Sequence, residues 1–437
     1  MWPYHPELLS VPVPRYTSYP TAVEFNDRVG LAEQEAALAQ VSGDISLYIH
    51  IPFCEQICWY CGCNTAAANK RSRLEAYLDA LHHEIALTGV KLGRQARVRR
   101  VAFGGGSPNA LQPTDFVRLA DALTLHMPLE SPEWSVEIDP RHLTSAWGTV
   151  MAVVGVTRAS LGVQTFAPNL QAAIGRIQPA EQIEQATALL RRAGVTSLNF
   201  DLMYGLPGQT MDDLKDSLDR TIALGADRVA LFGYAHVPHM IARQRRIDAT
   251  ALPDQAERFA MAHFGYDHFT KEGYVPVGFD HFALPGDPMA EAVRAGTLRR
   301  NFQGFTDDRS DVLVGLGSTA ISCFPQVIVQ NEKNAGRYGM MISQDRLPGM
   351  LGVIRSEDDR RRGAVIEALL CRGRAEVGAA WLASLAPQLA PFIERGLASI
   401  DGAWLTIAAD GLPYARTIAA LFDGYRGQSQ HRFSSAV

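Results

Sequence analysis

Alternation of apolar strands with helices is the feature that most restricts the fold of this chain. Six apolar segments have the pattern of strands: 45–52, 98–108, 134–140, 158–166, 196–207 and 227–238. Helical patterns separate them, for example at 71–89, 180–194 and 211–225. Strands that alternate with helices form parallel βαβ units. We therefore predict an α/β fold, a partial (βα)6 barrel that is an open relative of the eight-unit TIM barrel.

The sequence on either side of this pattern predicts two further parts. The segment VPRYTSYPTA (13–22) holds prolines and tyrosines that suit an extended segment laid over another surface. From about residue 356 the pattern turns helical again. We expect an N-terminal arm (1–40), a barrel with a substrate-covering extension (41–340) and a small, mostly helical C-terminal domain (341–437). The length of 437 residues agrees with two to three domains.

Composition excludes several classes of function. The net charge is −5, which argues against nucleic acid as the main partner, because phosphate binding normally needs a basic surface. No apolar run of about 18 residues is present, so no membrane-spanning helix is expected. The start of the chain lacks the pattern of a signal peptide. Clustered cysteines without a secretion signal fit a reducing cytoplasm.

The stretch IHIPFCEQICWYCGCNT begins at the end of the first predicted strand and contains most of the cysteines of the chain. It contains Cys54, Cys58, Cys61 and Cys63, whereas Cys323 and Cys371 are isolated. A structural zinc site would usually add a second cysteine pair downstream. Three close thiolates can instead hold three irons of a 4Fe–4S cluster and leave the fourth iron open. Buried thiols, a disulfide pair or a zinc knuckle remain alternatives at this point.

Two motifs follow the second and third strands. GGGSP (104–108) can bring backbone groups close to a ligand, although glycine runs are more often plain turns. Glu137 ends the third strand, and Asp139 lies two residues later on the same face. Either carboxylate could accept hydrogen bonds from a ribose or ammonium group. The alternative is a solvated loop carboxylate.

Three polar residues follow the later strands. Gln164 ends the fourth strand, where an amide can bond a ribose or carboxylate. Arg176, expected in the helix that follows, could pair with a carboxylate, or could be an ordinary surface arginine. Asp201 stands in an otherwise apolar strand, so its burial would require a partner. All these motifs lie at carboxyl ends of strands, where βα barrels place their chemistry.

Taken together, the motifs resemble one enzyme family. YIHIPFCEQICWYCGCN, FGGGSPNAL, VEIDPR, LGVQTF, NFDLMYGLPGQT and FGYAHVP occur in the expected order. They are similar to the oxygen-independent coproporphyrinogen III oxidases (coproporphyrinogen dehydrogenases) of the radical S-adenosylmethionine superfamily. Three further motifs narrow the match to these oxidases within the superfamily: PRYTSYPTA, GFDHFA (278–283) and NFQGF (301–305). The resemblance extends from about residue 14 to about residue 433.

The resemblance implies cofactors and the residues that contact them. Cys54, Cys58 and Cys61 would bind a 4Fe–4S cluster, and Cys63 would be a further cysteine needed for activity. One S-adenosylmethionine would contact Tyr48, Gly105, Glu137 and Ile321. A second would contact Tyr60, Gly106, Ser107, Gln164, Arg176, Asp201 and Ala235. Gly175 precedes Arg176 where the family often has asparagine.

The resemblance also implies the reaction and its partners. Two propionates of coproporphyrinogen III would become vinyl groups, giving protoporphyrinogen IX in anaerobic haem biosynthesis. An electron donor such as flavodoxin or ferredoxin and an unknown electron acceptor would take part, and the enzyme would be a cytoplasmic monomer. We expect arginines, with Arg15, Arg294, Arg299 and Arg300 as candidates, to neutralise the propionates. Rival interpretations are a haem-trafficking or haem-degrading relative and a non-catalytic iron–sulfur or zinc module.

Overall fold

The computed structural model describes residues 1–426, and their contacts form two compact units. The first, named the cysteine unit because it contains the four clustered cysteines, comprises Phe25–Asp201 and Ser310–Arg355. The second, named the arm unit, comprises Met1–Glu24, Leu202–Arg309 and the residues from Ser356 onward. The chain first passes from the cysteine unit to the arm unit within β7 (Ser197–Tyr204).

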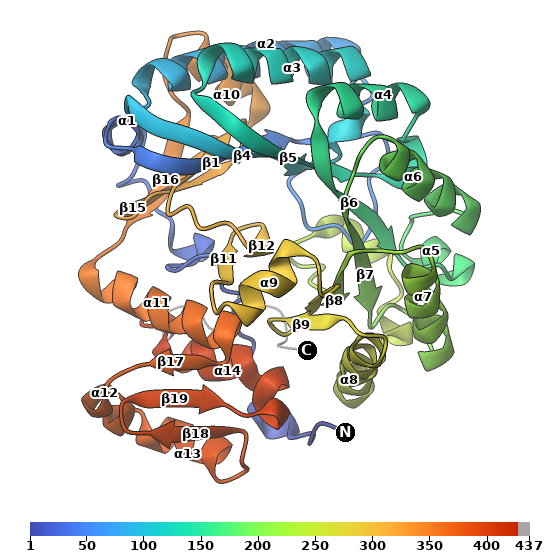
Figure 1. Ribbon diagram of the computed structural model, residues 1–437, viewed down its shortest axis with the longest axis vertical. Coiled ribbons are helices and arrows are strands. Elements are labelled where there is room, and N and C mark those ends of the chain that lie inside the picture. The colour runs from blue at the N-terminus through green and yellow to red at the C-terminus, as the bar shows by residue number, and fades with distance from the viewer. Residues whose placement is uncertain (427–437) are drawn as a thin grey trace. The chain divides into compact units, whose positions relative to one another are not determined.

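One mixed sheet forms the centre of the cysteine unit (Figure 1). Its strand order is β16-β15-β14-β13-β1-β4-β5-β6, followed by the first residues of β7. The parallel strands are β1 (Ser42–Ile51), β4 (Gln95–Gly105), β5 (Leu129–Ile138), β6 (Val156–Gln164) and β13 (Leu313–Leu316). The antiparallel continuation is β14 (Ile321–Cys323), β15 (Val327–Asn331) and β16 (Gly349–Ile354).

Helices cover the outer face of this sheet (Figure 1). They are α2 (Arg71–Lys91), α3 (Pro113–His126), α4 (Ser145–Val154), α5 (Pro168–Ala173) and α6 (Ala180–Arg192). On α3, Phe116, Leu119 and Leu123 recur at helical spacing, and all three are buried. The ring of Phe116 meets that of Phe103 on β4 at a centroid distance of 5.0 Å. This apolar seam fixes the helices to the sheet and leaves the strand ends for polar residues.

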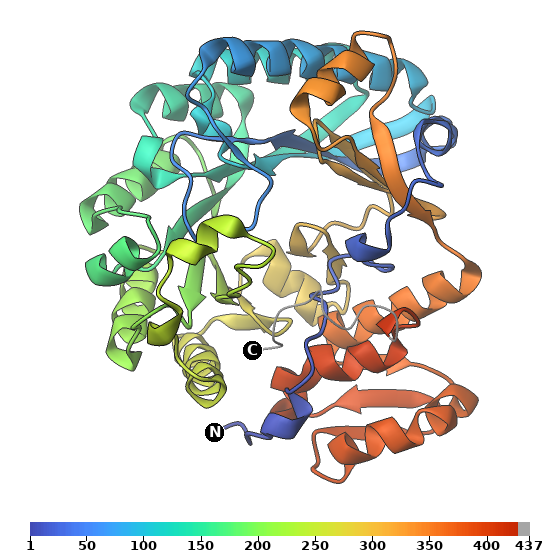
Figure 2. The same cartoon turned by 180° about the vertical axis from the view of Figure 1, so that it is seen from behind.

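A buried carboxylate joins α2 to the later part of the same unit. Glu84 accepts hydrogen bonds from Gly317 N and Tyr338 Oη, each at 2.6 Å, and from Asn331 Nδ2 at 3.0 Å. Tyr338 belongs to α10 (Ala335–Ile342), which lies beside α2 (Figure 2). Burial raises the pKa of Glu84 to about 7, and these three donors only partly oppose the effect. Glu84 therefore ties the turn between β13 and β14 to the helix layer.

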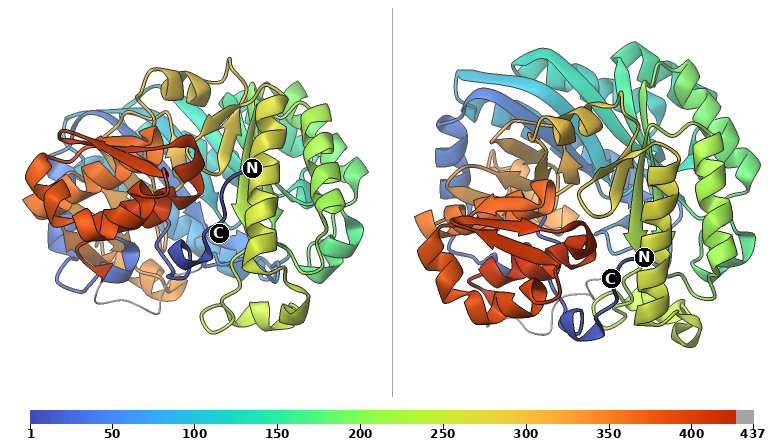
Figure 3. Two further views of the ribbon diagram at one scale, coloured as in Figure 1. Left: turned by 90° about the horizontal axis from the view of Figure 1, so that it is seen from below. Right: turned by 60° about the horizontal axis from the view of Figure 1, so that its bottom comes forward.

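The arm unit contains the remaining strands of the main sheet and two smaller sheets. The end of β7 is followed in strand order by β8 (Arg228–Gly233), β10 (His281–Ala283) and β9 (Val275–Val277), of which β10 is antiparallel to both neighbours. β11 (Arg299–Asn301) pairs with β12 (Gly304–Thr306). β17 (Arg374–Glu376), β19 (Trp404–Ile407) and β18 (Ala398–Asp401) form a three-stranded antiparallel sheet, and α13 (Ala386–Ile393) packs against β18 (Figure 3).

The helices of the arm unit come from its middle and C-terminal segments. They are α7 (Met211–Ala223), α8 (Gln255–Lys271), α9 (Pro288–Arg294), α11 (Glu357–Arg372), α12 (Ala379–Ser384), α13 (Ala386–Ile393) and α14 (Ala415–Ala419). The short helix α1 (Leu31–Ala39) belongs instead to the cysteine unit. Within residues 1–426, no helix is both long enough and apolar enough to cross a membrane.

The first residues of the chain pack against distant segments of the arm unit. The ring of Trp2 lies 6.3 Å from that of Phe259 on α8, measured between centroids. Tyr16 Oη donates to Asp423 Oδ2 at 2.9 Å, and Tyr19 Oη accepts from Gly424 N at 2.8 Å. These contacts hold PRYTSYP against the C-terminal segment without regular secondary structure.

The predicted α/β fold is confirmed. All six expected strands are present, as β1, β4, β5, β6, β7 and β8, and the three expected helices are α2, α6 and α7. The sequence did not predict β13–β16, nor the sheet of β17–β19 within the segment expected to be mostly helical. The boundaries of the arm (1–40), barrel (41–340) and C-terminal domain (341–437) stay predictions, and 427–437 lies outside the described residues.

Candidate active site

The cysteine loop leaves the carboxyl end of β1, and a short parallel bridge closes its base. β2 (Phe53–Cys54) pairs with β3 (Ala66–Ala67), and Ala68 N donates to the Cys54 carbonyl at 2.9 Å. Cys58 is buried, Cys54 and Cys61 are half-buried, and Cys63 is exposed. Burial, together with the neighbouring Cys61 and Cys58, raises the pKa of Cys54 to about 12. The three predicted ligands therefore form one electrostatically coupled group.

The glycine loop after β4 packs directly against the cysteine loop. Gly106 N donates to the Ile51 carbonyl, and Ser107 N to the Phe53 carbonyl, each at 2.8 Å. A Cβ atom on Gly106 would lie 2.5 Å from the Phe53 oxygen, so only glycine fits there. Gly105 N donates to Glu137 Oε2 at 3.0 Å. Because protein acceptors use these amides, the loop is unsuited to binding an anion through them.

Glu137 links the glycine loop to the end of β5. A Cβ atom on Gly104 would lie 2.5 Å from Glu137 Oε1, which explains the glycine at that position. Burial raises the pKa of Glu137 to about 7, opposed by the Gly105 amide and reinforced by Asp201. Glu137 is therefore not a solvated loop carboxylate. It is a fixed acceptor at a strand end.

Arg176 lies against the cysteine loop rather than on the surface. It follows α5 in the turn before α6, so the expectation that it belongs to a helix is wrong. Its Nη1 donates to Cys58 Sγ at 3.2 Å, and its Nη2 donates to the Gly162 carbonyl at 2.6 Å. The preceding Gly175 has φ of +66°, and a Cβ atom there would lie 2.6 Å from the ring of Trp59. This close contact requires glycine.

A second arginine and one carboxylate complete the polar cluster around Cys58. Arg141 Nη2 donates to Asp139 Oδ2 at 2.6 Å and to Cys58 Sγ at 3.4 Å. Arg176 Nη2 donates to Asp139 Oδ1 at 3.3 Å. Burial alone would raise the pKa of Asp139, but Arg176 and Arg141 outweigh it and lower the pKa to about 2. Asp139 thus orients two guanidinium groups toward one cysteine sulfur.

Tyr48 and Ile321 lie on strands on either side of β13. Tyr48 on β1 pairs with Gly315 of β13, which in turn packs against Ile321 of β14. Tyr48 Oη and His50 Nδ1 are 3.1 Å apart. Burial lowers the pKa of His50 to about 4, so its ring is neutral at pH 7. The ring also fills the space that a Cβ atom on Gly105 would occupy.

Gln164 ends β6 in a tight turn. Its φ is +67°, and Thr165 N donates to the Val163 carbonyl across it at 2.8 Å, which defines a γ-turn centred on Gln164. A positive φ is costly for a residue other than glycine. Its buried amide lies near Gly162, as does the guanidinium of Arg176. The strained backbone directs the amide into the polar cluster.

The remaining predicted residues have defined partners. Asp201 accepts hydrogen bonds from Ser160 Oγ on the neighbouring strand β6 at 2.9 Å and from Asn199 Nδ2 on its own strand β7 at 2.8 Å. Ser107 Oγ donates to Asn109 Oδ1 at 2.6 Å. The buried environment raises the pKa of Tyr60 well above its usual value.

The structure places all but one of the predicted site residues in the cysteine unit. The exception, Ala235, follows β8 in the arm unit, where its carbonyl accepts a hydrogen bond from Gln244 Nε2 at 3.0 Å. Sequence reasoning missed the roles of His50, Asn109 and Arg141. Asn109 exchanges two hydrogen bonds of 2.9 Å with the backbone of Asp139. Arg141 follows directly from the VEIDP motif, which is the signal that could have found it.

The donor set fits an iron–sulfur cluster better than a single metal ion. Among residues 1–426, no three His, Cys, Asp or Glu side chains are gathered closely enough for one ion. A cubane differs because each thiolate binds its own iron. Cys54, Cys58 and Cys61 share one loop, and two guanidinium groups donate to the sulfur of Cys58. Donors to sulfur suit a thiolate that is bound to a cluster.

Comparison with curated proteins finds full-length relatives. The sequence profile described as the Radical SAM superfamily matches residues 48–221. An oxygen-independent coproporphyrinogen III oxidase of Bradyrhizobium diazoefficiens is 41% identical, with 97% of each chain covered. A protein of the same description from Paracoccus denitrificans is 41% identical, with 96% of this chain and 95% of the relative covered.

A solved structure has the same fold over nearly the whole chain. It is the coproporphyrinogen III oxidase of Escherichia coli, described as a radical SAM enzyme. Its TM-score is 0.90 at 33% sequence identity, and the match covers 97% of this chain and 99% of that one.

Proposed function

The chain belongs to the oxygen-independent coproporphyrinogen III oxidases of the radical S-adenosylmethionine superfamily, and from this premise we propose the roles of its residues. It is an oxidoreductase of haem biosynthesis. The family uses a 4Fe–4S cluster and S-adenosylmethionine. We propose that the substrate is coproporphyrinogen III, and that two of its propionates lose carbon dioxide to become vinyl groups.

The cofactors provide chemistry that no amino-acid side chain can provide. When bound, they supply an electron and a carbon-centred radical that removes a hydrogen atom from the β-carbon of a propionate. The protein binds and orients the reactants and excludes water from them. We propose that Cys54, Cys58 and Cys61 would hold the cluster, and that Cys63 would be needed for activity without binding the cluster.

One S-adenosylmethionine is proposed to contact Tyr48, Gly105, Glu137 and Ile321. The acceptor that supports this most strongly is Glu137, because its fixed carboxylate can receive hydrogen bonds from a ribose hydroxyl or an ammonium group. The Gly105 amide already donates to Glu137. A ligand ammonium fits this loop better than a carboxylate does.

A second S-adenosylmethionine is the finer part of the proposal. Its expected contacts are Tyr60, Gly106, Ser107, Gln164, Arg176, Asp201 and Ala235. The support is that Gln164 and Asp201 end or interrupt neighbouring strands, and that a strained γ-turn holds the buried amide of Gln164 in place. Equilibrium dialysis of the cluster-loaded protein should give two S-adenosylmethionine molecules per chain, and Gln164→Ala should reduce that number to one without loss of iron.

The cysteine loop with its two guanidinium donors is the observation that carries the proposal. The decisive experiment is anaerobic incubation of the reconstituted protein with coproporphyrinogen III, S-adenosylmethionine and a reductant. Product masses lower by one and then two HCOOH equivalents are expected. Consumption of haem instead, with coproporphyrinogen III unchanged, would assign the chain to haem handling. We further propose a flavodoxin or ferredoxin as electron donor and a monomer in the cytoplasm, and the final electron acceptor stays open.

A further inference from the structure

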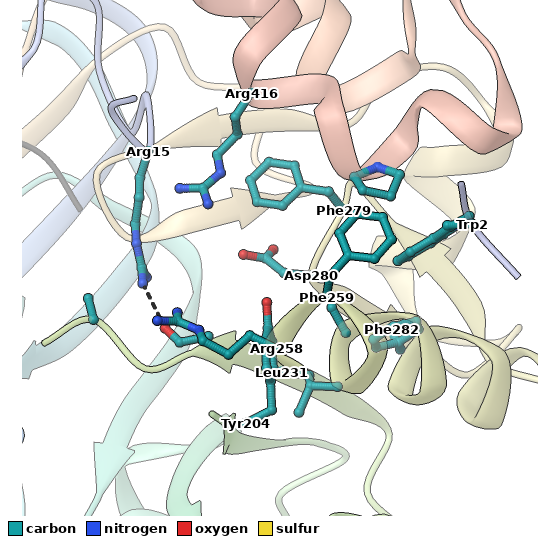
Figure 4. Close-up of a pocket in the computed structure, with 14 residues that line it drawn as sticks. Trp2, Arg15, Tyr204, Leu231, Arg258, Phe259, Phe279, Asp280, Phe282 and Arg416 are labelled. Atoms are coloured by element: carbon teal, nitrogen blue, oxygen red, sulfur yellow. Dashed lines mark hydrogen bonds between the residues drawn. The ribbon is translucent and has the colours of Figure 1, made fainter. Parts of the chain in front are cut away.

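A hollow in the arm unit has lining residues of two distinct kinds. It encloses about 770 Å³, part of which is open to solvent. Three arginines, Arg15, Arg258 and Arg416, lie on one side, and Phe282 and Trp2 lie on the other (Figure 4). Phe279 lies next to Arg416, whose Cζ is 5.6 Å from the centroid of its ring. The Asp280 carboxylate lies between Arg416 and Arg258 in this view. The three arginines come from the N-terminal arm, α8 and α14, which are distant in sequence.

The charges around this hollow are unbalanced. Asp280 is the one acidic residue of the lining, and its Oδ1 is already 2.6 Å from Nδ1 of His281. Arg300, next to the hollow, donates to the backbone oxygens of Tyr16 and Arg15 and lies 4.3 Å from the ring centroid of Phe305. Cations therefore outnumber anions here. An anionic ligand would correct the imbalance.

Two of the guanidinium groups lack protein acceptors. Within residues 1–426, neither Arg258 nor Arg416 forms an ion pair, and Nε of Arg258 is buried without a hydrogen-bond partner. Burial lowers the pKa of Arg416 to about 10, and repulsion from Arg15 adds to the effect. The pKa of Arg258 is likewise lowered, by burial and by repulsion from Arg15. Natural proteins rarely leave such donors unpaired unless a ligand or water completes them.

Two of the arginines that the sequence indicates as candidates already have acceptors within the protein. Arg294 donates to the Pro285 carbonyl, and Arg299 forms an ion pair with Glu367 at 2.9 Å. Within residues 1–426, Arg15 donates one hydrogen bond, from Nη2 to the Gly233 carbonyl at 3.3 Å; its Cζ lies 5.6 Å from the centroid of the Phe232 ring, and the residue is exposed. Among the described residues that line the hollow, the cations without an ion-pair partner are thus Arg15, Arg258 and Arg416.

We propose that this hollow binds a propionate carboxylate of the tetrapyrrole substrate, with Arg258 and Arg416 as its donors and Arg15 at the edge. The proposal rests on the proposed function, since it presumes that substrate. Guanidinium groups bind carboxylates through paired hydrogen bonds. The aromatic side chains opposite would receive the attached pyrrole ring, which is apolar on its faces.

The other available carboxylate belongs to S-adenosylmethionine, and its net charge argues against it. That cofactor carries a sulfonium and an ammonium group against one carboxylate, so it is cationic overall. A site with excess guanidinium charge disfavours it, although Ala235, a proposed contact of the second S-adenosylmethionine, also lines the hollow. Coproporphyrinogen III carries four carboxylates and no cation, so the same field attracts it.

The test uses coproporphyrin III, the stable oxidised form with the same four propionates, as a fluorescent probe. Arg258→Gln and Arg416→Gln should each weaken its binding about ten- to a hundredfold, the worth of a charged hydrogen bond. Arg245→Gln removes an exposed arginine from the same unit and should leave binding unchanged. S-adenosylmethionine affinity should be unchanged in all three variants.

Thermal unfolding separates binding from support of the fold. Because Arg258 and Arg416 are unpaired and partly buried, neutral replacements should leave the melting temperature unchanged or raise it. A lower melting temperature, with normal probe affinity per folded molecule, would make them structural and overturn the proposal. Arg416→Lys keeps the positive charge but removes the paired N–H donors of the guanidinium group. This variant should bind the probe with intermediate affinity.

Two failures can be told apart. If the wild-type enzyme neither binds coproporphyrin III nor converts coproporphyrinogen III, the proposed function itself is wrong. If the wild-type enzyme binds coproporphyrin III and converts coproporphyrinogen III, and the Gln variants have the same probe affinity, only the assignment of the hollow is wrong. Loss of S-adenosylmethionine binding in those variants, with the probe affinity preserved, would assign the hollow to the cofactor instead.

Discussion

Arg176 donates a hydrogen bond to the sulfur of Cys58 across 3.2 Å, although 118 positions separate the two residues in the chain. The same side chain contacts Asp139 and the Gly162 carbonyl, so its position is set from three sides. A charged donor at a cluster sulfur stabilises the reduced cluster, which carries one more negative charge. The arginine therefore has a role toward the cluster in addition to any contact with S-adenosylmethionine.

Arg176→Gln should make the reduction potential of the 4Fe–4S cluster more negative. The variant loses the positive charge that favours the reduced state, while the three cysteines remain. Redox titration followed by electron paramagnetic resonance measures this shift, and iron and sulfide analysis checks that the cluster is intact. Arg176→Lys retains the charge and should shift the potential less. An unchanged potential in the Gln variant would show that the contact has no electronic effect.

The four cysteines of the loop should divide into two classes. Replacement of Cys54, Cys58 or Cys61 by serine should remove the cluster together with activity, because each is expected to bind one iron. Cys63→Ser should retain most of the iron and sulfide yet lose turnover. Iron content and visible absorption of anaerobically reconstituted protein separate the classes. Complete cluster loss in Cys63→Ser would make Cys63 a ligand.

Glu137→Ala should weaken S-adenosylmethionine binding by about tenfold or more, the worth of a hydrogen bond to a charged group. The change removes the carboxylate that Gly105 N contacts at 3.0 Å and that the ligand is expected to share. Iron content should stay normal. An anaerobic binding titration measures the affinity, and Glu181→Ala on the exposed end of α6 is a matched control. Unaltered affinity would rule out the role of Glu137.

Glu84 should make stability depend on pH. Its carboxyl has a pKa raised from 4.5 to about 7, so the folded state retains a proton that the unfolded chain releases. The contribution of Glu84 to folding is therefore fully present below pH 4.5, and this contribution, up to about 3 kcal/mol, is lost as the pH rises to about 7. Chemical unfolding of apoprotein between pH 5 and pH 8 should show this fall.

Glu84→Gln provides the control for that pH dependence, because glutamine does not titrate. The variant should lose the hydrogen bond from Asn331 at every pH, but its stability should change less between pH 5 and pH 8 than that of the wild type. Equal slopes in the two proteins would show that another group titrates.

The barrel strands and the cysteine loop can be predicted from sequence because each depends on local pattern. β1, for example, contains the largely apolar, β-branched stretch ISLYIHI (45–51), and the spacing of Cys54, Cys58 and Cys61 is contained within eight residues. The position of Arg176 cannot be predicted in this way. It depends on the left-handed Gly175 and on the ring of Trp59 that packs against it, a contact between segments far apart in the chain.

The arginines of the hollow show the same limit. Residue type alone indicates Arg15, Arg294, Arg299 and Arg300 as candidates, but pairing in the fold decides which cations remain available to a ligand. Arg299 is neutralised by Glu367 on α11, whereas Arg416 has no such partner in the described chain. Charge type is local information, and charge balance is a property of the folded unit.

The γ-turn at Gln164 bears on which mutations this position can accept. Glycine adopts a φ of +67° without cost, and asparagine does so more readily than most residues. If only the backbone conformation mattered, glycine or asparagine would be the favoured residue at position 164. Gln164 therefore holds a backbone conformation that its residue type disfavours, which agrees with a role for its side-chain amide. Gln164→Gly should accordingly raise the thermal stability of the protein and lower its activity. A screen for thermal stability alone would favour that change.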